Sequence, residues 1–174
     1  MGKKNDISDA DLLLLVNEWL DYMPATGIFL WKKVNGQKMK VGQRAGGKSH
    51  GYRIIKINKI PYYEHRLAYI VKHKWLPEFI DHIDRVKDNN HITNLRAATE
   101  SQNGSNKTLR SDNKSGTKGV CWNKRRQNWQ VRISANGVAI YLGSFIDLTD
   151  AIAARRAGDL KYHGEFSCIE AKVI

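Results

Sequence analysis

The stretch of sequence that decides the fold runs Ile80-Asp81-His82-Ile83-Asp84, followed by Asn89-Asn90, Asn94-Leu95-Arg96 and Asn103. It sets a carboxylate beside an imidazole and follows them with asparagines at three separate places. Carboxylate and amide oxygens bind hard divalent cations, and a neutral imidazole takes a proton from water. This combination of ligands and base is typical of metal-dependent hydrolysis.

The elements around this stretch are predicted from local patterns. Asp81 and His82 are neighbours on a predicted strand, so their side chains point to opposite faces. Leu95 to Ala98 is the returning strand, and Thr99 begins a helix because Thr99-Glu100-Ser101-Gln102 fits a capping box. Asn103 lies in the first turns of that helix, from which its amide oxygen can swing back towards Asp81. The helix N-terminus also presents N–H groups to a phosphate.

These segments resemble the HNH nuclease motif of phage homing endonucleases, in the variant whose last ligand is Asn instead of His. Three more segments match that family: Gly51-Tyr52, His65-Arg66-Leu67-Ala68 and Asp88-Asn89-Asn90. The resemblance implies that Asp81 and Asn103 bind one divalent cation, Mg²⁺ or Mn²⁺. It also implies that His82 activates the attacking water and that Asn94 braces the loop so that the His82 ring is oriented.

Other residues of the motif have more than one interpretation. Asn89 and Asn90 are typical of turns, and Asp84 is either a support for the metal ligands or a turn acid. His65 is interpreted as a packed, hydrogen-bonded histidine. Four histidines are interpreted as surface residues: His50, His73, His91 and His163. The chain departs from the family at Arg85-Val86, where Gly-Asn or Gly-Asp is usual.

The chain is strongly basic, with a net charge of +12 over 174 residues. One stretch, from Tyr22 to Tyr63, holds nine Lys or Arg and no acid. A second stretch holds six basic residues against only Asp112: Lys114, Lys118, Lys124, Arg125, Arg126 and Arg132. Either stretch alone could equally be a solvent-exposed charged surface or a binding surface for a polyanion. Two such stretches flanking a metal-type motif favour a polyanionic partner, double-stranded DNA.

Periodicity and turn residues predict the other elements of the first half. Ser8 to Asp21 is a predicted helix, capped by Ser8 and ended by Pro24 and Gly27. His65 to Lys74 is a second predicted helix. The predicted strands are Ile28–Trp31, Tyr52–Ile57 and Ile60–Tyr63, with Asn58-Lys59 as a hairpin turn between the last two.

The second half is predicted to form a separate small module. Residues 107–117 have linker composition and divide the chain into domains 1–106, with a ββα-metal core at about 78–106, and 118–166. Trp129, Val131 and Ile133 alternate with polar residues, as in a half-buried strand. Asn136-Gly137 is a hairpin turn leading to a strand over Val138 to Phe145, and Asp147 then begins a helix that ends near His163. The predicted class is α+β: a nuclease module followed by a three-stranded antiparallel sheet and one helix.

This module resembles the APETALA2-type DNA-binding domain, in which a three-stranded sheet enters the major groove. The matching segments are Lys118-Gly119-Val120, Trp129, Leu142-Gly143-Ser144-Phe145 and the Ala-rich helix ending near Gly164. The resemblance implies five DNA-facing positions: Lys118, Gln130, Arg132, Ser134 and Tyr141. Alternation independently places Gln130, Arg132 and Ser134 on the face opposite Trp129, and the basic residues Lys124 and Arg125 complete the predicted DNA contacts.

The two halves together predict a metal-dependent DNA endonuclease, a site-specific homing enzyme acting in the cytoplasm of a host cell. Two alternatives stay open: a non-catalytic DNA-binding regulator with a relic HNH fold, and a non-specific RNA-binding protein. No membrane association is predicted, because the apolar run Leu12 to Val16 is too short to span a bilayer. The target site, the number of strands cut and the oligomeric state are not fixed by the sequence.

Overall fold

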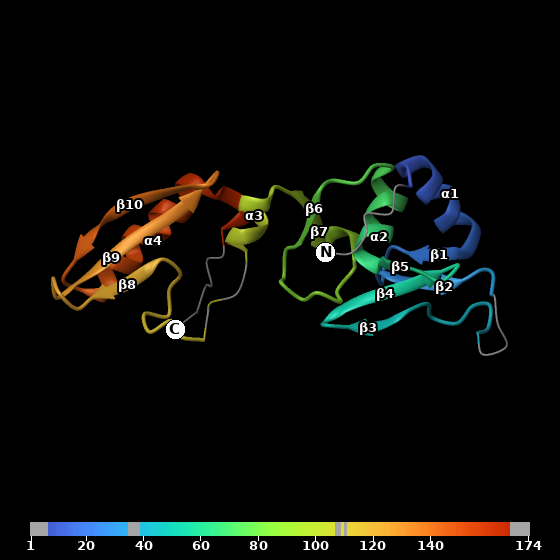
Figure 1. Ribbon diagram of the computed structural model, residues 1–174, viewed down its shortest axis with the longest axis horizontal. Coiled ribbons are helices and arrows are strands. Elements are labelled where there is room, and N and C mark those ends of the chain that lie inside the picture. The colour runs from blue at the N-terminus through green and yellow to red at the C-terminus, as the bar shows by residue number, and fades with distance from the viewer. Residues whose placement is uncertain (1–6, 35–38, 107–108, 110, 168–174) are drawn as a thin grey trace. The chain divides into compact units, whose positions relative to one another are not determined.

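The computed structural model describes residues 7–34, 39–106, 109 and 111–167. Contacts divide the chain into two compact units, unit 1 (Met1–Ala97) and unit 2 (Ala98–Ile174), which Figure 1 shows in ribbon form. No helix among the described residues is long and apolar enough to cross a membrane. The predicted domain limits, 1–106 and 118–166, remain a prediction.

Unit 1 begins with a helix that runs directly into a hairpin. Helix α1 (Asp9–Trp19) is capped by Ser8, whose side chain accepts a hydrogen bond from the Asp11 N–H as predicted. The predicted helix end at Asp21 is wrong, because Leu20 already has extended backbone angles. Strand β1 (Leu20–Met23) starts there and pairs antiparallel with β2 (Ile28–Trp31). Pro24 and Gly27 therefore lie in a hairpin turn and do not end the helix.

The second sheet of unit 1 has the order β3-β4-β5, built from β3 (Gly47–Ser49), β4 (Tyr52–Ile57) and β5 (Ile60–Tyr63). The predicted turn at Asn58-Lys59 is confirmed, since both residues have positive φ, 50° and 69°. Helix α2 (Glu64–His73) follows β5 at once.

A buried ion pair links this sheet to α2. Arg53 Nε lies 2.5 Å from Glu64 Oε2, and both side chains are buried. Burial raises the pKa of Glu64, and the Arg53 charge opposes the rise. Arg53 also donates to the Ala45 carbonyl oxygen. One of the basic residues counted between Tyr22 and Tyr63 is thus structural and is not part of the charged surface.

A further two-stranded sheet consists of β6 (Phe79–His82) and β7 (Leu95–Ala98), with a short 3-10 helix, η1 (Ile92–Asn94), just before β7. The main core packs α1 and α2 against the strands; its largest fully buried side chains are Phe29, Ile55, Ile57, Leu67, Ile70 and Val16.

Unit 2 begins with the predicted capped helix. In α3 (Glu100–Ser105) the Thr99 and Gln102 side chains each bond the other's backbone N–H, so the capping box is confirmed. Farther along, Ser115 is buried and its hydroxyl donates to the Val120 carbonyl oxygen at 2.7 Å. The later part of the predicted linker is therefore packed against the sheet that follows.

The sheet of unit 2 is antiparallel with the order β10-β9-β8, built from β8 (Val120–Asn123), β9 (Asn128–Ala135) and β10 (Val138–Phe145). Helix α4 (Leu148–Tyr162) lies along it in Figure 1, and a 3-10 turn, η2 (Gly164–Phe166), follows. Small residues allow the close approach: a Cβ at Gly158 would collide with the Leu142 side chain. The predicted three strands and one helix are confirmed, as is the Asn136-Gly137 turn.

Candidate functional site

Asp81 and His82 lie at the end of β6, and both are buried, with 4% and 7% of their surface exposed. The Asp81 carboxylate faces Arg96 on the neighbouring strand β7. Its Oδ2 accepts from Arg96 Nε at 2.9 Å and lies 2.8 Å from Nη2. The β6–β7 pairing thus places a guanidinium on a buried carboxylate and fixes its orientation. Arg96 belongs to the motif, but no role was predicted for it from the sequence.

The His82 ring is held on one side by an asparagine and on another by aromatic rings. Its Nε2 lies 3.1 Å from Asn90 Oδ1. An amide oxygen only accepts, so this contact needs a proton on Nε2. The ring centroids of His65 and Tyr52 lie 5.2 and 6.3 Å from that of His82. The His82 ring therefore has the fixed orientation that a general base needs.

His65 is packed as predicted, but the hydrogen bond predicted for it is not made at Nδ1. That nitrogen is buried and has no hydrogen-bond partner among the described atoms. Burial, with smaller contributions from His82 and Arg66, lowers the pKa of His65 to about 3. His65 is therefore a neutral ring at physiological pH and contributes packing beside His82.

Asn94 braces the loop between β6 and β7. Its Oδ1 accepts from the Asp84 N–H at 3.0 Å, and its Nδ2 donates to Asp84 Oδ1 and to the Asn89 carbonyl oxygen, both at 2.9 Å. Asp84 also accepts from the Val86 N–H. Burial raises the pKa of Asp84, but the hydrogen bonds from Asn89, Val86 and Asn94 lower it by more, so it lies below its usual range. Asp84 is a turn acid that Asn94 ties down.

The same loop explains the departure at Arg85. This residue has φ 65°, the left-handed conformation that favours glycine. The chain therefore keeps a glycine-type turn with an arginine at the position where the family usually has Gly.

Two predicted surface histidines are instead structural. His91 Nε2 lies 2.8 Å from the Ala25 carbonyl oxygen, which joins the loop to the β1–β2 hairpin. In unit 2, His163 Nδ1 lies 3.0 Å from Asp159 Oδ1, and its Nε2 lies 2.9 Å from the Ser134 carbonyl oxygen. The spacing of Asp159 and His163, i and i+4 on one helix, was a signal for the second case. No neighbouring residue in the sequence indicated the contact of His91 with Ala25.

The donors available to a metal ion fit a hard cation. Among the described residues, no group of three or more His, Cys, Asp or Glu side chains could hold a metal ion. Mg²⁺ typically needs one or two carboxylates and completes its shell with water and substrate phosphate oxygens. Asp81 supplies such a carboxylate. Asn103 belongs to α3 of unit 2, so its pairing with Asp81 stays a prediction.

In unit 2, four of the predicted DNA-facing residues share the sheet face opposite α4. Val131 and Ile133 are buried on the helix side, and Gln130, Arg132 and Ser134 alternate with them, as predicted. Tyr141 on β10 is the register partner of Arg132, which puts it on the same face. Arg132, Ser134 and Tyr141 are exposed, and Gln130 is half-buried.

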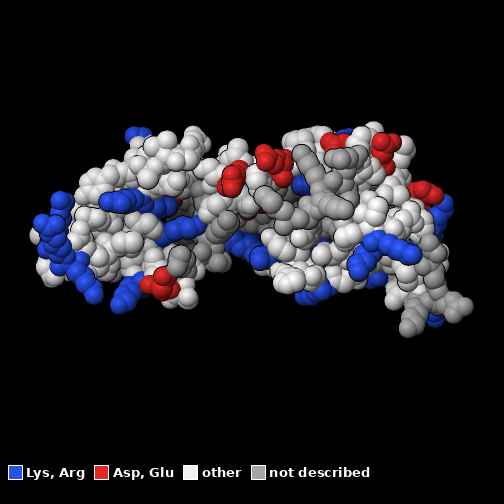
Figure 2. Space-filling view, viewed as in Figure 1, with Lys and Arg blue, Asp and Glu red and all other residues white. Residues whose placement is uncertain are grey.

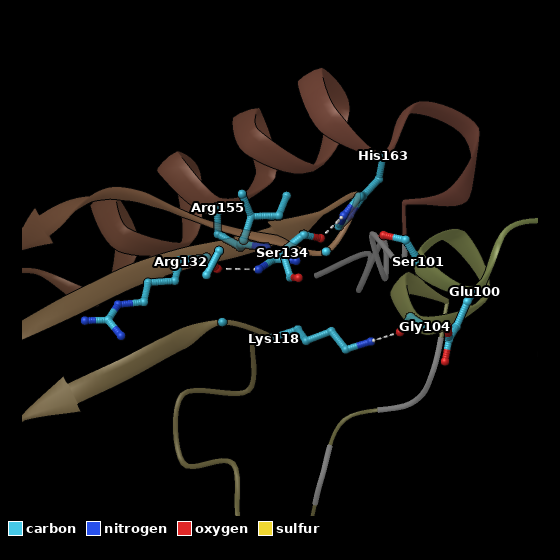
Figure 3. A pocket seen from close by; sticks show the side chains of 12 residues that line it. Glu100, Ser101, Gly104, Lys118, Arg132, Ser134, Arg155 and His163 are labelled. Carbon is cyan, nitrogen blue, oxygen red and sulfur yellow. Dashed lines mark hydrogen bonds between the residues drawn. The ribbon is translucent and has the colours of Figure 1, made fainter.

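The other predicted contacts lie away from that face. Lys124, Arg125 and Arg126 are exposed on the turn between β8 and β9, and Figure 2 shows Lys and Arg side chains gathered at this end of unit 2. Lys118 lines a cavity of about 550 Å³ beside α3 and donates to the Gly104 carbonyl oxygen at 3.0 Å (Figure 3). Figure 3 also shows the Arg132 guanidinium directed away from α3.

Arg155 and His163 also line the cavity, and both are engaged in the fold. Arg155 is buried and pairs with Asp159 through two hydrogen bonds of 2.9 Å. Its third bond, 2.6 Å long, goes to the Arg132 carbonyl oxygen. These residues connect α4 to β9, so they stabilise the sheet that presents Arg132.

The comparisons with known proteins agree with this geometry. A family model described as HNH endonuclease matches residues 62–105, which include β6, the braced loop, β7 and α3. The chain thus carries an HNH endonuclease domain. Protein 3.8 of Escherichia phage T7 is 34% identical to it over 89 residues, 51% of this chain and 73% of that protein. The chain belongs to the same family as this phage protein. No solved structure matches it significantly.

Proposed function

We propose that this protein is a metal-dependent endonuclease that hydrolyses phosphodiester bonds in duplex DNA, acting as a site-specific homing endonuclease. The observation that carries the proposal is the buried His82 ring, held through Nε2 by Asn90 and adjacent in sequence to the buried carboxylate of Asp81. This contact holds the ring in one orientation, which is what a general base needs.

The chemistry assigned to His82 is general-base catalysis. A water molecule gives a proton to the His82 imidazole while its oxygen forms a bond to phosphorus. The bond from phosphorus to the leaving sugar oxygen breaks, and that oxygen takes a proton from solvent. Asn94 keeps the loop closed around the base by holding Asp84 and the Asn89 carbonyl.

Asp81 would hold the divalent cation, with Asn103 as the second ligand that the motif predicts. Oxygen ligands favour Mg²⁺ or Mn²⁺. When bound, the cation stabilises the negative charge that develops on the phosphoryl and leaving oxygens. Arg96 donates to Oδ2 of Asp81, which holds the carboxylate in one orientation.

Unit 2 would select the site in DNA. The open sheet face carries Gln130, Arg132, Ser134 and Tyr141, whose side chains are of the kinds that read base edges. Lys124 and Arg125 at the β8–β9 turn would contact phosphates, as their charge and exposure suit. Lys118 joins this set by resemblance to the APETALA2-type domain.

The proposal is tested with purified protein and phage or host genomic DNA. We expect cleavage at defined positions with Mg²⁺ or Mn²⁺, loss of cleavage in EDTA, and recovery when the metal is returned. Asp81→Ala is expected to be inactive at any metal concentration, and Asn103→Asp to retain more activity than Asn103→Ala. Duplex binding without cleavage would favour a regulator, and tighter binding to RNA would favour an RNA-binding protein; either result rejects the endonuclease.

A further inference from the structure

We infer that the sheet of unit 2 holds the helix that carries Asn103, and that Lys118 is the positioning residue for this proposed metal ligand. The inference rests on the proposed function, since it assigns how the second ligand of that site is placed. It gives Lys118 a role other than the DNA contact that the resemblance implies. The HNH match covers residues 62–105 and so ends with α3, whereas α3 itself belongs to unit 2.

The first argument is that α3 is too short to hold its conformation alone. It has six residues, Glu-Ser-Gln-Asn-Gly-Ser, and none of their side chains is apolar. Isolated helices shorter than about 12 residues are marginal in water, and the glycine at position 104 lowers helix stability further. The capping box fixes only the first turn. The rest of α3 must therefore be held by contacts with other elements.

The second argument is that the sheet binds α3 on both sides of Asn103 in the sequence. The Ser101 hydroxyl accepts from the backbone N–H of Asn136, in the β9–β10 turn, at 3.1 Å. The Lys118 ammonium donates to the Gly104 carbonyl oxygen at 3.0 Å (Figure 3). A lysine at the end of a helix bonds one of the last carbonyls and interacts favourably with the helix dipole. The two bound residues, 101 and 104, thus bracket the predicted ligand.

The third argument is the cavity of about 550 Å³ beside α3. It is lined by Glu100 and Ser101 of the helix and by Ile133 and Ser134 of β9. Close packing therefore does not hold α3 against β9 at this place, and the polar contacts of Ser101 and Lys118 carry the attachment. Removing either contact should loosen the helix.

The position of Lys118 is itself fixed by the sheet. The next residue, Gly119, has φ 73°, and a Cβ there would collide with the Arg132 carbonyl oxygen. The Gly119 carbonyl oxygen accepts from the Arg132 N–H at 2.9 Å. Lys118 therefore extends from backbone that is bound to β9, the strand proposed to read DNA. The placement of Asn103 and the reading of DNA then depend on the same strand.

The direct test measures two quantities for the full chain without DNA: hydrogen exchange of the α3 amides, and Mn²⁺ affinity by electron paramagnetic resonance. In Lys118→Ala, the Asn103 N–H, which bonds the Thr99 carbonyl oxygen, should exchange about tenfold faster. Mn²⁺ should bind about tenfold more weakly. Lys118→Arg keeps a donor and should be close to wild type. Lys161→Ala removes a lysine at an exposed position of α4 and should change neither quantity.

A double-mutant cycle shows whether Lys118 acts through Asn103. Asn103→Ala should lose Mn²⁺ affinity without faster exchange in α3, since only the ligand is removed. Adding Lys118→Ala to that variant should cause no further loss of Mn²⁺ affinity. Ser101→Ala removes the contact nearer the start of the helix and should also raise the exchange rate. It replaces Lys118→Ala in the experiment if thermal unfolding shows that Lys118→Ala does not fold.

Four results would overturn the inference: unchanged exchange in α3 of Lys118→Ala, faster exchange with unchanged Mn²⁺ affinity, additive losses in the double variant, or a wild type that binds no Mn²⁺. A DNA contact at Lys118 would instead appear as weaker duplex binding in EDTA, with a smaller salt dependence and unchanged exchange. Cleavage is not needed for any of these measurements. If wild type binds Mn²⁺ but does not cleave DNA, the proposed function is rejected, while exchange and Mn²⁺ binding still decide the role of Lys118.

Discussion

Unit 1 and unit 2 use their polar side chains in opposite ways. In unit 1, Asp81, His82, Asn90 and Asn94 are all buried, and hydrogen bonds from neighbouring segments fix each of them. In unit 2, the side chains of Arg132, Ser134 and Tyr141 project from an open sheet face. The bonds that hold that sheet, such as Arg155 to the Arg132 carbonyl, lie behind the face and are made to the backbone.

The difference reflects what each task needs. A general base must be held in one orientation and one protonation state, which requires burial and several partners. A side chain that reads a groove must reach its partner, which requires exposure on a rigid support. Substitutions in unit 1 should therefore alter the rate of the chemical step, and those on the face of unit 2 should alter affinity and site choice.

The largest expected effect is at His82. His82→Ala should lower cleavage about 10²- to 10⁴-fold with DNA affinity near wild type, because only the general base is lost. His73→Ala, an exposed histidine of α2, is the matched control and should cleave normally. Rates are measured at saturating DNA and metal. If His82→Ala cleaves DNA at the wild-type rate, His82 is not the general base.

A second effect concerns the pH dependence of stability in unit 1. The folded pKa of His65 is about 3, and the ordinary unfolded value is about 6.5. The unfolded chain binds the proton first, so stability falls as the pH drops from 6.5 towards 3, by on the order of 2 kcal/mol at pH 5. In His65→Phe this pH-dependent contribution to the free energy of unfolding is absent. Urea unfolding at pH 7 and pH 5 should show a smaller loss for the variant; equal losses would mean that His65 is not buried in its neutral form.

A third effect tests the open face of unit 2. If Arg132 contacts a base edge, Arg132→Ala should cost about 1–3 kcal/mol of binding to the preferred site and relax specificity at one position. Lys114→Ala, an exposed lysine, should weaken all sequences alike and reduce the salt dependence. Binding is measured on a panel of duplexes at two salt concentrations. If both variants lower the affinity for all duplexes equally, the open sheet face of unit 2 binds DNA without reading its sequence.

The smallest effect is at the loop turn. Arg85→Val should destabilise the protein by about 1–2 kcal/mol, since a β-branched residue is poorly tolerated at φ 65°. Arg85→Gly removes the same side chain without this backbone strain, so it should be the more stable of the two variants. Chemical denaturation compares the two variants. If the Val variant is as stable as the Gly variant, the turn at residue 85 can change its backbone conformation at no cost. The hydrogen bonds of Asn94 would then not hold the loop rigid.

The local parts of this structure follow from local sequence. The Ser8 cap, the Thr99 capping box, the Asn58-Lys59 and Asn136-Gly137 turns and the alternation in β9 depend on residues a few positions apart, and all are confirmed. The α1 boundary was wrong because Leu20 to Met23 gain strand pairing with β2, which outweighs helix continuation.

The contacts that matter most for the site join residues from separate elements. Asn90 reaches His82 across a loop, His91 bonds Ala25 from 66 residues away, and Arg96 meets Asp81 across a strand pair. Turn propensity explains an asparagine at position 90 equally well, so composition alone did not distinguish the two roles. Only the packed fold shows which oxygen faces the imidazole.

The most direct test of this division measures two quantities for three proteins: wild type, His82→Ala and Arg132→Ala. These are the dissociation constant for a duplex containing the mapped cleavage site and the cleavage rate when that duplex is saturating. We expect His82→Ala to lose rate with an unchanged dissociation constant, and Arg132→Ala to lose affinity with an unchanged rate. If both variants change the same quantity, chemistry and site selection are not divided between the two units.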